Sequence, residues 1–565
     1  MALDDILKRV GEFGNYQKFV VALVSLSSIF AGLYGVMTVV ILHTPEHRCK
    51  IPDLENDTYA IHNHHQQILI NNYIPPSPND VTHVYDQCHL YAFDRKTVKF
   101  DNSSRPINAT MVRCVEWVYS GSAFEETFTS KYNIVCEDNH ITSLIKSLFF
   151  VGKFIGAVVF GNMSDTIGRK VTFYISLMMY FVVTFGSSWS SSYIVYAVLT
   201  VAIGAEAQGV FIVGFVIGVE IAGPSKRKLA GMILQYSFII GLVILPGVSY
   251  LARHWYYINI ICSAPIGLFI GYWWLLPESP RWLISKQRYE EASTTLHKIA
   301  RVNKTTIKND LSDEMEEEVE EVKPSGRMWH LFSSRVMLVR TLIVLFNWCI
   351  ASMTYYGLYL NTGNLAGNFH FNMFLSGLVE FPAITVIILL VDRVGRKPLY
   401  CLSMILAGCA CASIIIPMMY GEIENQVVIV ILAMIGKFAV STGFNTLYLF
   451  SAELYPTVVR NAGMGTSCCA SRIGGILAPY IADSAAFIGG MTGKVFPVAV
   501  FGVMTILAGL SSLFLPETLN MALPETIEDG IMFGKLRTHI TKHDSTLLRK
   551  TTNGKSTGGI NEDEA

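Results

Sequence analysis

Twelve long apolar runs constrain this chain more than any other feature of its sequence. Each is long enough to cross the roughly 30 Å hydrocarbon core of a bilayer as a helix, and lipid offers the backbone no hydrogen-bond partner outside such a helix. Only 15% of the residues are charged and 51% are hydrophobic, which excludes an ordinary soluble domain. The sequence therefore predicts an all-α membrane protein with twelve transmembrane helices. The runs lie at roughly 18–42, 141–161, 171–190, 193–221, 229–251, 256–276, 339–361, 371–391, 398–420, 427–452, 462–484 and 495–515.

Basic residues gather in the short loops on one side of these helices. Those after the second, fourth, eighth and tenth predicted helices carry Arg169, Lys170, Lys226, Arg227, Lys228, Arg393, Arg396, Lys397 and Arg460. The short loops on the other side carry only Arg253 and Lys494. Because short loops rich in Lys and Arg stay in the cytoplasm, the pattern predicts cytoplasmic termini and an extracellular loop at 43–140.

The long loop has the chemistry of an extracytoplasmic segment. It holds four of the eleven cysteines, Cys49, Cys88, Cys114 and Cys136, and glycosylation sequons at Asn56, Asn102 and Asn108. Glycan transfer and disulfide formation both occur outside the cytosol. We expect glycan on the sequons and two disulfides, and the three possible pairings of four cysteines stay open. No His or Cys spacing in the chain predicts a metal site.

The apolar runs divide the chain into two six-helix halves, 18–276 and 339–515. Residues 1–17 are predicted to be a cytosolic N-terminus. Residues 277–338 form a cytosolic linker, with helical periodicity at its start and the acidic run "DEMEEEVEEVK" further on. Residues 516–565 form a cytosolic tail, rich in polar residues and expected to be largely disordered.

Three motifs occur once in each half at similar offsets. "GNMSDTIGRK" begins at Gly161 and "DRVGRK" at Asp392. The pattern E-x6-R runs from Glu220 to Arg227 and from Glu453 to Arg460, and "PES" and "PET" follow the sixth and twelfth runs. Transporters built from parallel repeats have this organisation, with a substrate site near the membrane midplane between the halves. The repeat therefore favours a transporter over an ion channel.

The repeated turn resembles that of the major facilitator superfamily, in which G-x3-D-x2-G-R-[KR] joins helices 2 and 3 and a counterpart joins helices 8 and 9. This resemblance implies two six-helix pseudo-repeats that rock about a cytoplasmic gate. We expect Asp165 and Asp392 to pair with bases at neighbouring helix ends, such as Arg227 or Arg460. The alternative is a static turn whose bases only fix the topology. The implied gate residues are Gly161, Asp165, Gly168, Arg169, Lys170, Glu220, Arg227, Asp392, Gly395, Arg396, Glu453 and Arg460.

A narrower resemblance covers nearly the whole chain. The large outer loop, "YWWLLPESPRWLISKQR", "YYGLYLNTGNLAGN", "LVEFPA" and "AELYPTVVRN" are similar to the organic cation and carnitine transporter family. Many members have six cysteines in the outer loop, so four imply one disulfide fewer. The resemblance implies a plasma-membrane carrier of small organic cations or zwitterions that works by alternating access, as a monomer and without a nucleic-acid partner.

Charged residues inside apolar runs are functional candidates, because burying a charge in lipid costs several kcal/mol. By resemblance, Glu380 lies where related carriers have a carboxylate that balances the substrate's ammonium group. Alternatively, Glu380 pairs with Lys437 or Arg472. By the same resemblance, Arg472 is typical of carnitine-type and anion-selective members, and its guanidinium suits a carboxylate. The full set is Lys153, Glu206, Glu380, Lys437, Arg472 and Asp483.

Aromatic residues complete the predicted cavity, because a quaternary ammonium over a ring face gains about 0.5 to 2 kcal/mol. By resemblance, Phe211, Phe238 and Tyr355 match cavity positions of the family. For each ring, packing alone is the alternative. Polar contacts and possible sodium coordination are assigned to Gln208. The additional cavity candidates are Trp348, Phe215 and Gln235.

Together these features favour a carrier of organic cations or zwitterions, with carnitine-like compounds as the favoured class. An organic anion exchanger is the nearest alternative, and Glu380 argues against it. A sugar porter, a transport-like receptor and a channel are further alternatives. An enzyme is not expected, since the chain has no phosphate-binding glycine loop and no nucleophile elbow. No cofactor is predicted, and coupling to Na+ or H+ stays open.

Overall fold

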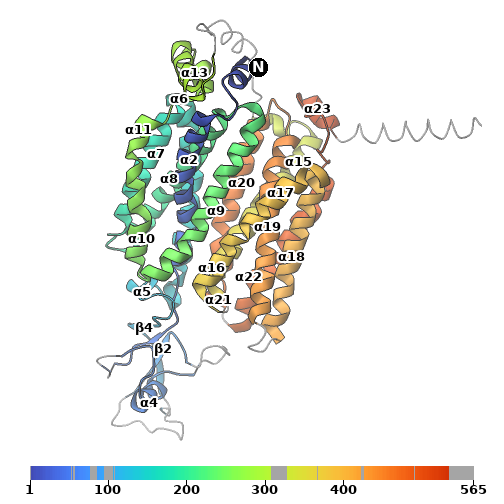
Figure 1. The fold of residues 1–565 in the computed structure, drawn as a ribbon. Coiled ribbons are helices and arrows are strands. Elements are labelled where there is room, and N and C mark those ends of the chain that lie inside the picture. The colour runs from blue at the N-terminus through green and yellow to red at the C-terminus, as the bar shows by residue number, and fades with distance from the viewer. Residues whose placement is uncertain are drawn as a thin grey trace, which may run out of the picture.

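The computed structural model describes residues 2–52, 54, 57–76, 85–93, 106, 109–306, 328–365, 367–420, 426–488 and 490–533. Asn56, Asn102 and Asn108, the acidic run of the linker and the tail beyond 533 lie outside these residues. The molecule is an elongated helical bundle with a small domain at one end and short helices at the other (Figure 1). We call the end with the small domain, 43–135, the outer end and the opposite end the inner end.

Six membrane-spanning segments form the first half, drawn blue to green in Figure 1. The last of them is continued by a 3-10 stretch, η3, that begins next to Pro265. Proline lacks the N–H that an α-helix needs, which accounts for the change of helix type. The elements are α2 (Asn15–Gly35), α3 (Met37–Ile41), α6 (His140–Ile167), α7 (Arg169–Ser187), α8 (Tyr193–Glu220), α9 (Arg227–Ala252), α10 (Trp255–Ser263), η3 (Ala264–Gly271) and α11 (Tyr272–Leu275).

The second half repeats this plan. Eleven segments of the described chain are long and apolar enough to cross a membrane. The twelfth is α20, which contains Arg460 and Arg472 and packs against α15 of its own half and α6 of the first half. The predicted twelve-helix architecture is confirmed. The elements are α15 (Arg335–Leu360), α16 (Phe369–Leu378), α17 (Glu380–Val394), α18 (Arg396–Tyr420), α19 (Gln426–Leu454), α20 (Arg460–Ala482), α21 (Ala485–Ile488) and α22 (Gly490–Ser511).

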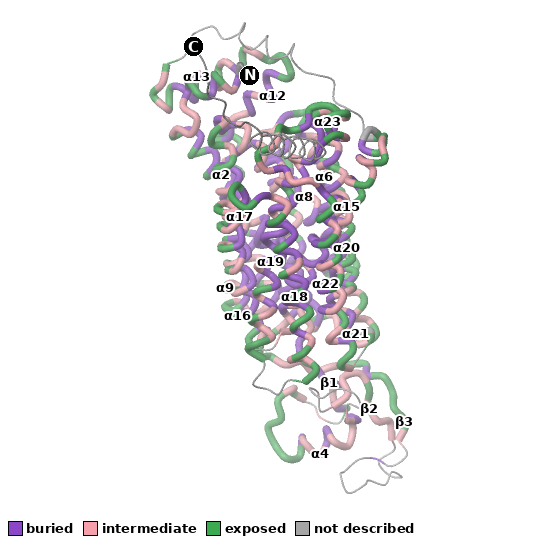
Figure 2. The backbone as a smooth tube through the Cα atoms, turned by 90° about the vertical axis from the view of Figure 1, so that its right-hand side faces the viewer, coloured by how far each residue is buried: buried purple, intermediate pink, exposed green. Residues whose placement is uncertain are grey.

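The eighth span consists of two helices, and the candidate residue Glu380 lies where they meet. Helix α16 ends at Leu378 and α17 begins at Glu380, two residues before Pro382. Because Pro382 has no N–H to donate to the carbonyl of Leu378, one helical hydrogen bond is absent there. Val379 connects the two helices, and Glu380, the first residue of α17, is buried there. Figure 2 shows in purple how buried residues fill the middle of the bundle.

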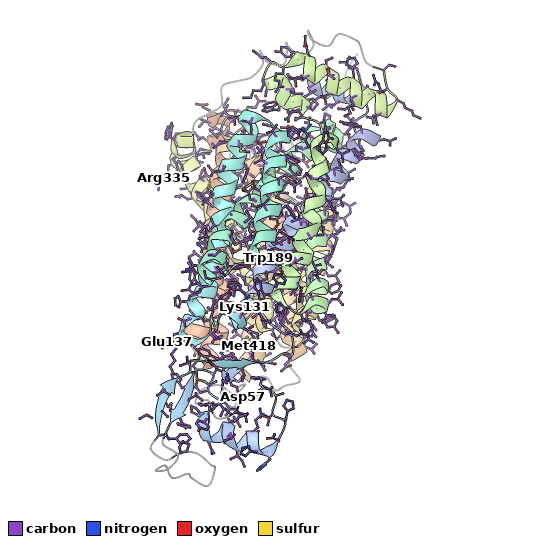
Figure 3. The ribbon with its side chains drawn as sticks, turned by 90° about the vertical axis from the view of Figure 1, so that its left-hand side faces the viewer. Asp57, Lys131, Glu137, Trp189, Arg335 and Met418 are labelled. Carbon is purple, nitrogen blue, oxygen red and sulfur yellow. A yellow bond between two sulfur atoms is a disulfide. The ribbon has the colours of Figure 1, made fainter. Side chains whose placement is uncertain are left out.

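The outer domain is a disulfide-linked unit of short elements. Two antiparallel pairs, β1 (His47–Cys49) with β4 (Trp117–Tyr119) and β2 (His89–Ala92) with β3 (Thr110–Arg113), lie near α4 (His64–Tyr73) and α5 (Phe128–Lys131). The disulfides join Cys49 to Cys114 and Cys88 to Cys136, which settles the pairing that the sequence left open. The second ties the domain to η1 (Cys136–Asn139) at the start of α6. Figure 3 shows Asp57 in this domain, where it pairs with Arg48 at 2.5 Å.

Short helices cover the inner end. They are α1 (Ala2–Arg9), α12 (Pro280–Ser285), α13 (Tyr289–Asn303) and α23 (Ile527–Met532). Of the 3-10 turns, η2 (Pro224–Lys226) lies between α8 and α9, and η4 (Met328–Phe332) precedes α15. Helices α12 and α13 account for the helical periodicity expected at the start of the linker. Figures 1 and 2 place these helices at the end opposite the disulfide-linked domain.

Candidate functional site

A buried ion pair lies where α16 meets α17. The Lys437 ammonium of α19 is 3.0 Å from Glu380 Oε1, and the Tyr355 hydroxyl of α15 donates to the same oxygen at 2.7 Å. Glu380 is 3% exposed and Lys437 is 1% exposed. The sequence left Glu380 as a contact for the substrate ammonium or as the partner of Lys437 or Arg472. In this structure Glu380 forms the ion pair with Lys437. A carboxylate buried in this way needs such compensation, because an unpaired charge is costly.

Two tyrosine rings complete the surroundings of Lys437. Its Nζ atom lies 3.4 Å from the centre of the Tyr355 ring and 4.7 Å from that of Tyr359. An ammonium is therefore held by one carboxylate and by ring faces, the two contacts that best recognise organic cations. Sequence reasoning did not find Tyr359, although it lies one helical turn after Tyr355 and so shares its face.

Arg472 links the two halves without an acidic partner. Its Nη2 donates to Gln208 Oε1 of α8 at 3.1 Å, and its Nε is buried without a hydrogen-bond partner. Arg472 is 8% exposed and, within the described part of the chain, forms no ion pair. Its guanidinium thus keeps free donor capacity for an anion. Gln208, predicted as a polar cavity contact, serves here as the acceptor for Arg472.

The predicted aromatic residues fall into two groups. Phe211 of α8 and Phe238 of α9 meet edge to face at 5.4 Å between ring centres, and both are half-buried. Phe215 lies against Gly231 of α9, and Gln235 of α9 is also half-buried. Trp348 is fully buried and donates to Ser451 at 2.8 Å, so it packs inside the second half in this conformation.

Two further rings of the second half lie beside these residues. The Phe444 ring is 5.6 Å from that of Tyr355, and the Tyr448 ring is 4.3 Å from that of Trp348. Sequence reasoning missed both. Their spacing of four residues on α19, starting seven residues after Lys437, was the available signal, since it places all three on one helix face.

The remaining charged candidates have different surroundings. Lys153 of α6 is buried against rings, with its Nζ 5.1 Å from the Phe149 centre and 5.5 Å from the Tyr356 centre. Glu206 is half-buried, and its Oε2 is buried without a hydrogen-bond partner. Asp483 lies near the outer end, as expected, and pairs with Lys146 at 2.9 Å.

The two halves are joined at the outer end. Asp483 of the second half accepts hydrogen bonds from Lys146 and from Ser143 at 2.7 Å, both on α6 of the first half. Nearby, the Ser147 hydroxyl donates to the Ile476 carbonyl at 2.7 Å. These contacts close the outer side of the space between the halves.

The inner end has a matching charged cluster in each half. In the first, Asp165 and Glu220 both pair with Arg169, at 2.8 and 3.4 Å, and Glu278 of the PES motif accepts the backbone N–H of Arg169 at 2.9 Å. The turn residue Gly168 has φ +110°, a conformation that favours glycine.

The second half repeats this geometry. Arg396 pairs with Glu453 at 2.9 Å and with Asp392 at 3.1 Å, and Glu517 of the PET motif accepts the backbone N–H of Arg396 at 3.0 Å. Gly395 has φ +104°. The duplicated motifs thus form duplicated structures, and the roles of "PES" and "PET" as caps on α7 and α18 were not foreseen.

The acid and base partners differ from those expected. Arg227 pairs with Asp4 of α1 and not with Asp165. Arg460 bonds to the Tyr455 carbonyl and the Thr457 hydroxyl and not to Asp392. Sequence spacing could not reveal these partners, because α1 reaches Arg227 only in the folded chain. One link between the halves does use Asp392, which pairs with Lys228 at 3.0 Å, with both side chains more than half exposed.

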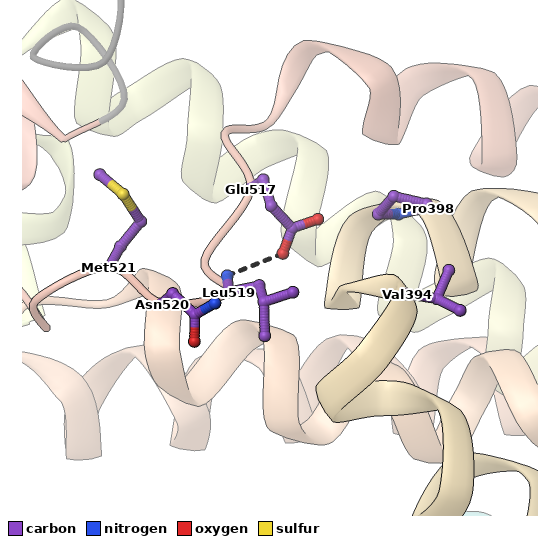
Figure 4. A pocket seen from close by; sticks show the side chains of 6 residues that line it. All are labelled: Val394, Pro398, Glu517, Leu519, Asn520 and Met521. Carbon is purple, nitrogen blue, oxygen red and sulfur yellow. Dashed lines mark hydrogen bonds between the residues drawn. The ribbon is translucent and has the colours of Figure 1, made fainter. Parts of the chain in front are cut away.

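A hollow of about 420 Å³ lies beside the repeated turn of the second half (Figure 4). At the turn of the first half, the Trp282 indole N–H donates to the Asp165 carbonyl at 3.1 Å. The hollow lies at the inner edge, apart from the central ion pair. It is lined by Val394, Pro398, Glu517, Leu519, Asn520 and Met521.

Comparison with known proteins agrees with this architecture. Residues 111–529 match the family described as "Sugar (and other) transporter". The chain is 35% identical to the organic cation transporter protein of Drosophila melanogaster, over 95% of each chain. It is 32% identical to the human organic cation/carnitine transporter 2, over 97% of each chain.

Solved structures show the same fold at low sequence identity. The xylose transporter XylE of E. coli in its inward-open conformation has a TM-score of 0.60 and 15% identity, over 90% of this chain and 98% of XylE. Its partially occluded inward-open form has a TM-score of 0.59 and 16% identity, over 90% of this chain and 100% of that one.

Proposed function

Because the chain belongs to the sugar (and other) transporter family, and within it to the organic cation and carnitine transporters of the major facilitator superfamily, we propose that it moves small organic cations or zwitterions across a membrane by alternating access. It is a multi-pass transporter and not an enzyme. Carnitine-like compounds, with one quaternary ammonium and one carboxylate, are the favoured substrates. The relatives named above support transport of organic cations or carnitine as the class of function. The buried charges of the site support a zwitterion as the substrate within that class.

The single observation that supports a zwitterion is that the bundle offers a buried acid, Glu380, and a buried base without an ion pair among the described residues, Arg472. Glu380 and the Tyr355 ring already hold one ammonium, that of Lys437. A substrate ammonium would compete with Lys437 for the same carboxylate and ring. The free donors of Arg472 would take the substrate carboxylate, in a charge-assisted contact worth about 1.5 to 3 kcal/mol.

In this proposal the central pair also couples binding to movement. Displacement of Lys437 would free the Glu380 carboxylate, and the substrate ammonium would then compensate its charge. The two ends would open in turn: the Lys146–Asp483 closure breaks at the outer end while the inner end is closed, and it forms again before the inner clusters separate as the halves rock. The half-exposed Lys228–Asp392 pair is weak enough to open, since exposed pairs contribute about 0 to 1 kcal/mol.

We also propose where the carrier acts and in which form. It acts in the plasma membrane as a monomer, with both termini cytoplasmic and with glycan on the outer loop. It needs no cofactor, and its uptake is driven by Na+ or H+ or by the substrate gradient alone.

Uptake of labelled carnitine, tetraethylammonium and an aromatic anion in the same cells, with sodium present or replaced, tests this function. We expect carnitine uptake above tetraethylammonium uptake, and loss of carnitine uptake without sodium would establish coupling. Arg472→Asp removes the donor and replaces a buried cation by an acid, so preference should move toward tetraethylammonium. Arg472→Gln is the control for loss of charge alone, and it should lower carnitine uptake while moving the preference toward tetraethylammonium less than Arg472→Asp does.

An organic anion exchanger is the second candidate, and one observation favours it. Apart from Lys146, which pairs with Asp483, three cations, Lys153, Lys437 and Arg472, are buried in the bundle, and among the described residues only Glu380 forms an ion pair with any of them. Uptake of the aromatic anion without carnitine uptake would replace the zwitterion proposal with this one.

A further inference from the structure

Lys153 is a buried cation that the proposed transport cycle does not use. It lies on α6 of the first half and is 5% exposed. Its ammonium faces two rings, Phe149 of its own helix and Tyr356 of α15 in the second half. Lys153 therefore reaches across the interface between the halves.

Lys153 has no acidic partner within the described residues, where it forms no ion pair. Ring faces offer a buried ammonium only about 0.5 to 2 kcal/mol, far less than the cost of removing its hydration. The positive charge of Lys153 is therefore not compensated by an acid among the described residues. By contrast, Lys146, seven residues earlier on the same face of α6, has Asp483 at 2.9 Å.

Arg472 shares these surroundings. Tyr356 lies between Lys153 and Arg472, because its ring centre is 5.5 Å from the Lys153 ammonium and its helix, α15, packs against α20, which carries Arg472. Arg472 also holds Gln208 and keeps its Nε free of any hydrogen bond. The two cations come from opposite halves, α6 and α20, which pack against each other. An acidic group placed between them would contact both halves.

We infer that Lys153 and Arg472 together form the subsite for the acidic group of the substrate, and that Lys153 determines the preference for acid-bearing substrates over simple cations. This rests on the proposed function and names the part of the site that sets its selectivity. A carboxylate has two oxygens, so it can accept from Arg472 with one and from Lys153 with the other. A simple cation would be repelled by both.

The test compares Lys153→Gln with Lys153→Arg in cells, after surface protein has been quantified. In Lys153→Gln, the carnitine concentration for half-maximal uptake should rise about tenfold or more, since one charge-assisted hydrogen bond is lost. Tetraethylammonium uptake should stay the same or increase. Lys153→Arg, which keeps the charge, should remain within about threefold of the unaltered protein.

Lys146→Gln is the matched control, because it removes the same charge from the same face of α6 where an acid already compensates it. It should change uptake of both substrates alike. An unchanged ratio of carnitine to tetraethylammonium uptake in Lys153→Gln, or an equal change of that ratio in Lys146→Gln, would overturn the inference.

Failure of the proposed function gives a different result. If the unaltered protein takes up the aromatic anion and not carnitine, the same variants are measured with that anion, and a tenfold loss in Lys153→Gln still supports the subsite. If a variant does not reach the surface, ligand-induced thermal stabilisation of purified protein replaces uptake. Equal stabilisation of Lys153→Gln and the unaltered protein by the acid-bearing ligand would then overturn the subsite.

Discussion

At the scale of single residues, the Glu380–Lys437 pair is the arrangement with most consequence. It joins α17 to α19, and the Tyr355 hydroxyl adds a third helix, α15. Glu380 could be predicted because an acid inside an apolar run stands out in the sequence, and Tyr355 because it resembles a cavity position of the family. Lys437 could only be named as one of two candidate partners.

Removing one member of this pair should destabilise the protein strongly. Lys437→Met or Glu380→Gln alone leaves the partner buried and unpaired, at a cost of about 3 to 5 kcal/mol. The double variant should recover part of the loss, because no uncompensated charge remains. Melting temperature of the purified proteins measures this. Destabilisation in the double variant equal to the sum of the single ones would contradict a direct pair. Transport should stay low in all three.

At the scale of elements, α1 is held against the inner end by an apolar face and one acid. Leu3, Ile6, Leu7 and Val10 are buried. Burial raises the pKa of Asp4, but the hydrogen bond and charge of Arg227 and the charge of Arg281 outweigh it and keep the pKa below its ordinary value. Asp4 thereby joins the first residue of α9 to α12, and α1 connects the linker helices to the first half.

We predict that Asp4→Asn lowers the maximal uptake rate several-fold without changing the substrate concentration for half-maximal uptake. The reason is that Asp4 orients Arg227 at the inner gate and lies far from the central pair. Asp5→Asn is the matched control, since the neighbouring acid is exposed and, among the described residues, its ion pair is with Lys8 one turn away. Equal effects of the two variants, measured by uptake at matched surface expression, would refute a specific role for Asp4.

At the scale of the whole molecule, the structure is closed at the outer end. Lys146 and Asp483 are only 11% and 13% exposed, so their pair is shielded from solvent, unlike the exposed Lys228–Asp392 pair at the inner end. Alternating access requires the shielded pair to form and break in each cycle.

Charge reversal tests this closure. Asp483→Lys places two cations together and should reduce uptake several-fold, since like charges disfavour the closed state. The swapped variant, Lys146→Asp with Asp483→Lys, should restore much of the uptake because it restores the attraction. Uptake at matched surface expression is the measurement. A swap no more active than Asp483→Lys alone would show that the pair does not form the closure.

The sequence by itself determined the twelve helices, because lipid leaves an apolar run no other way to satisfy its backbone. It also determined the repeated turns and the buried charges worth examining, since motif and burial cost are local properties. Only the tertiary structure showed which of three disulfide pairings forms and that Trp348 packs inside one half. It also showed that Glu380 pairs with Lys437 and that Asp4 pairs with Arg227. These are contacts between segments far apart in the chain. Helical periodicity fixes which face a residue lies on, but only the packing of the helices fixes which residue that face meets.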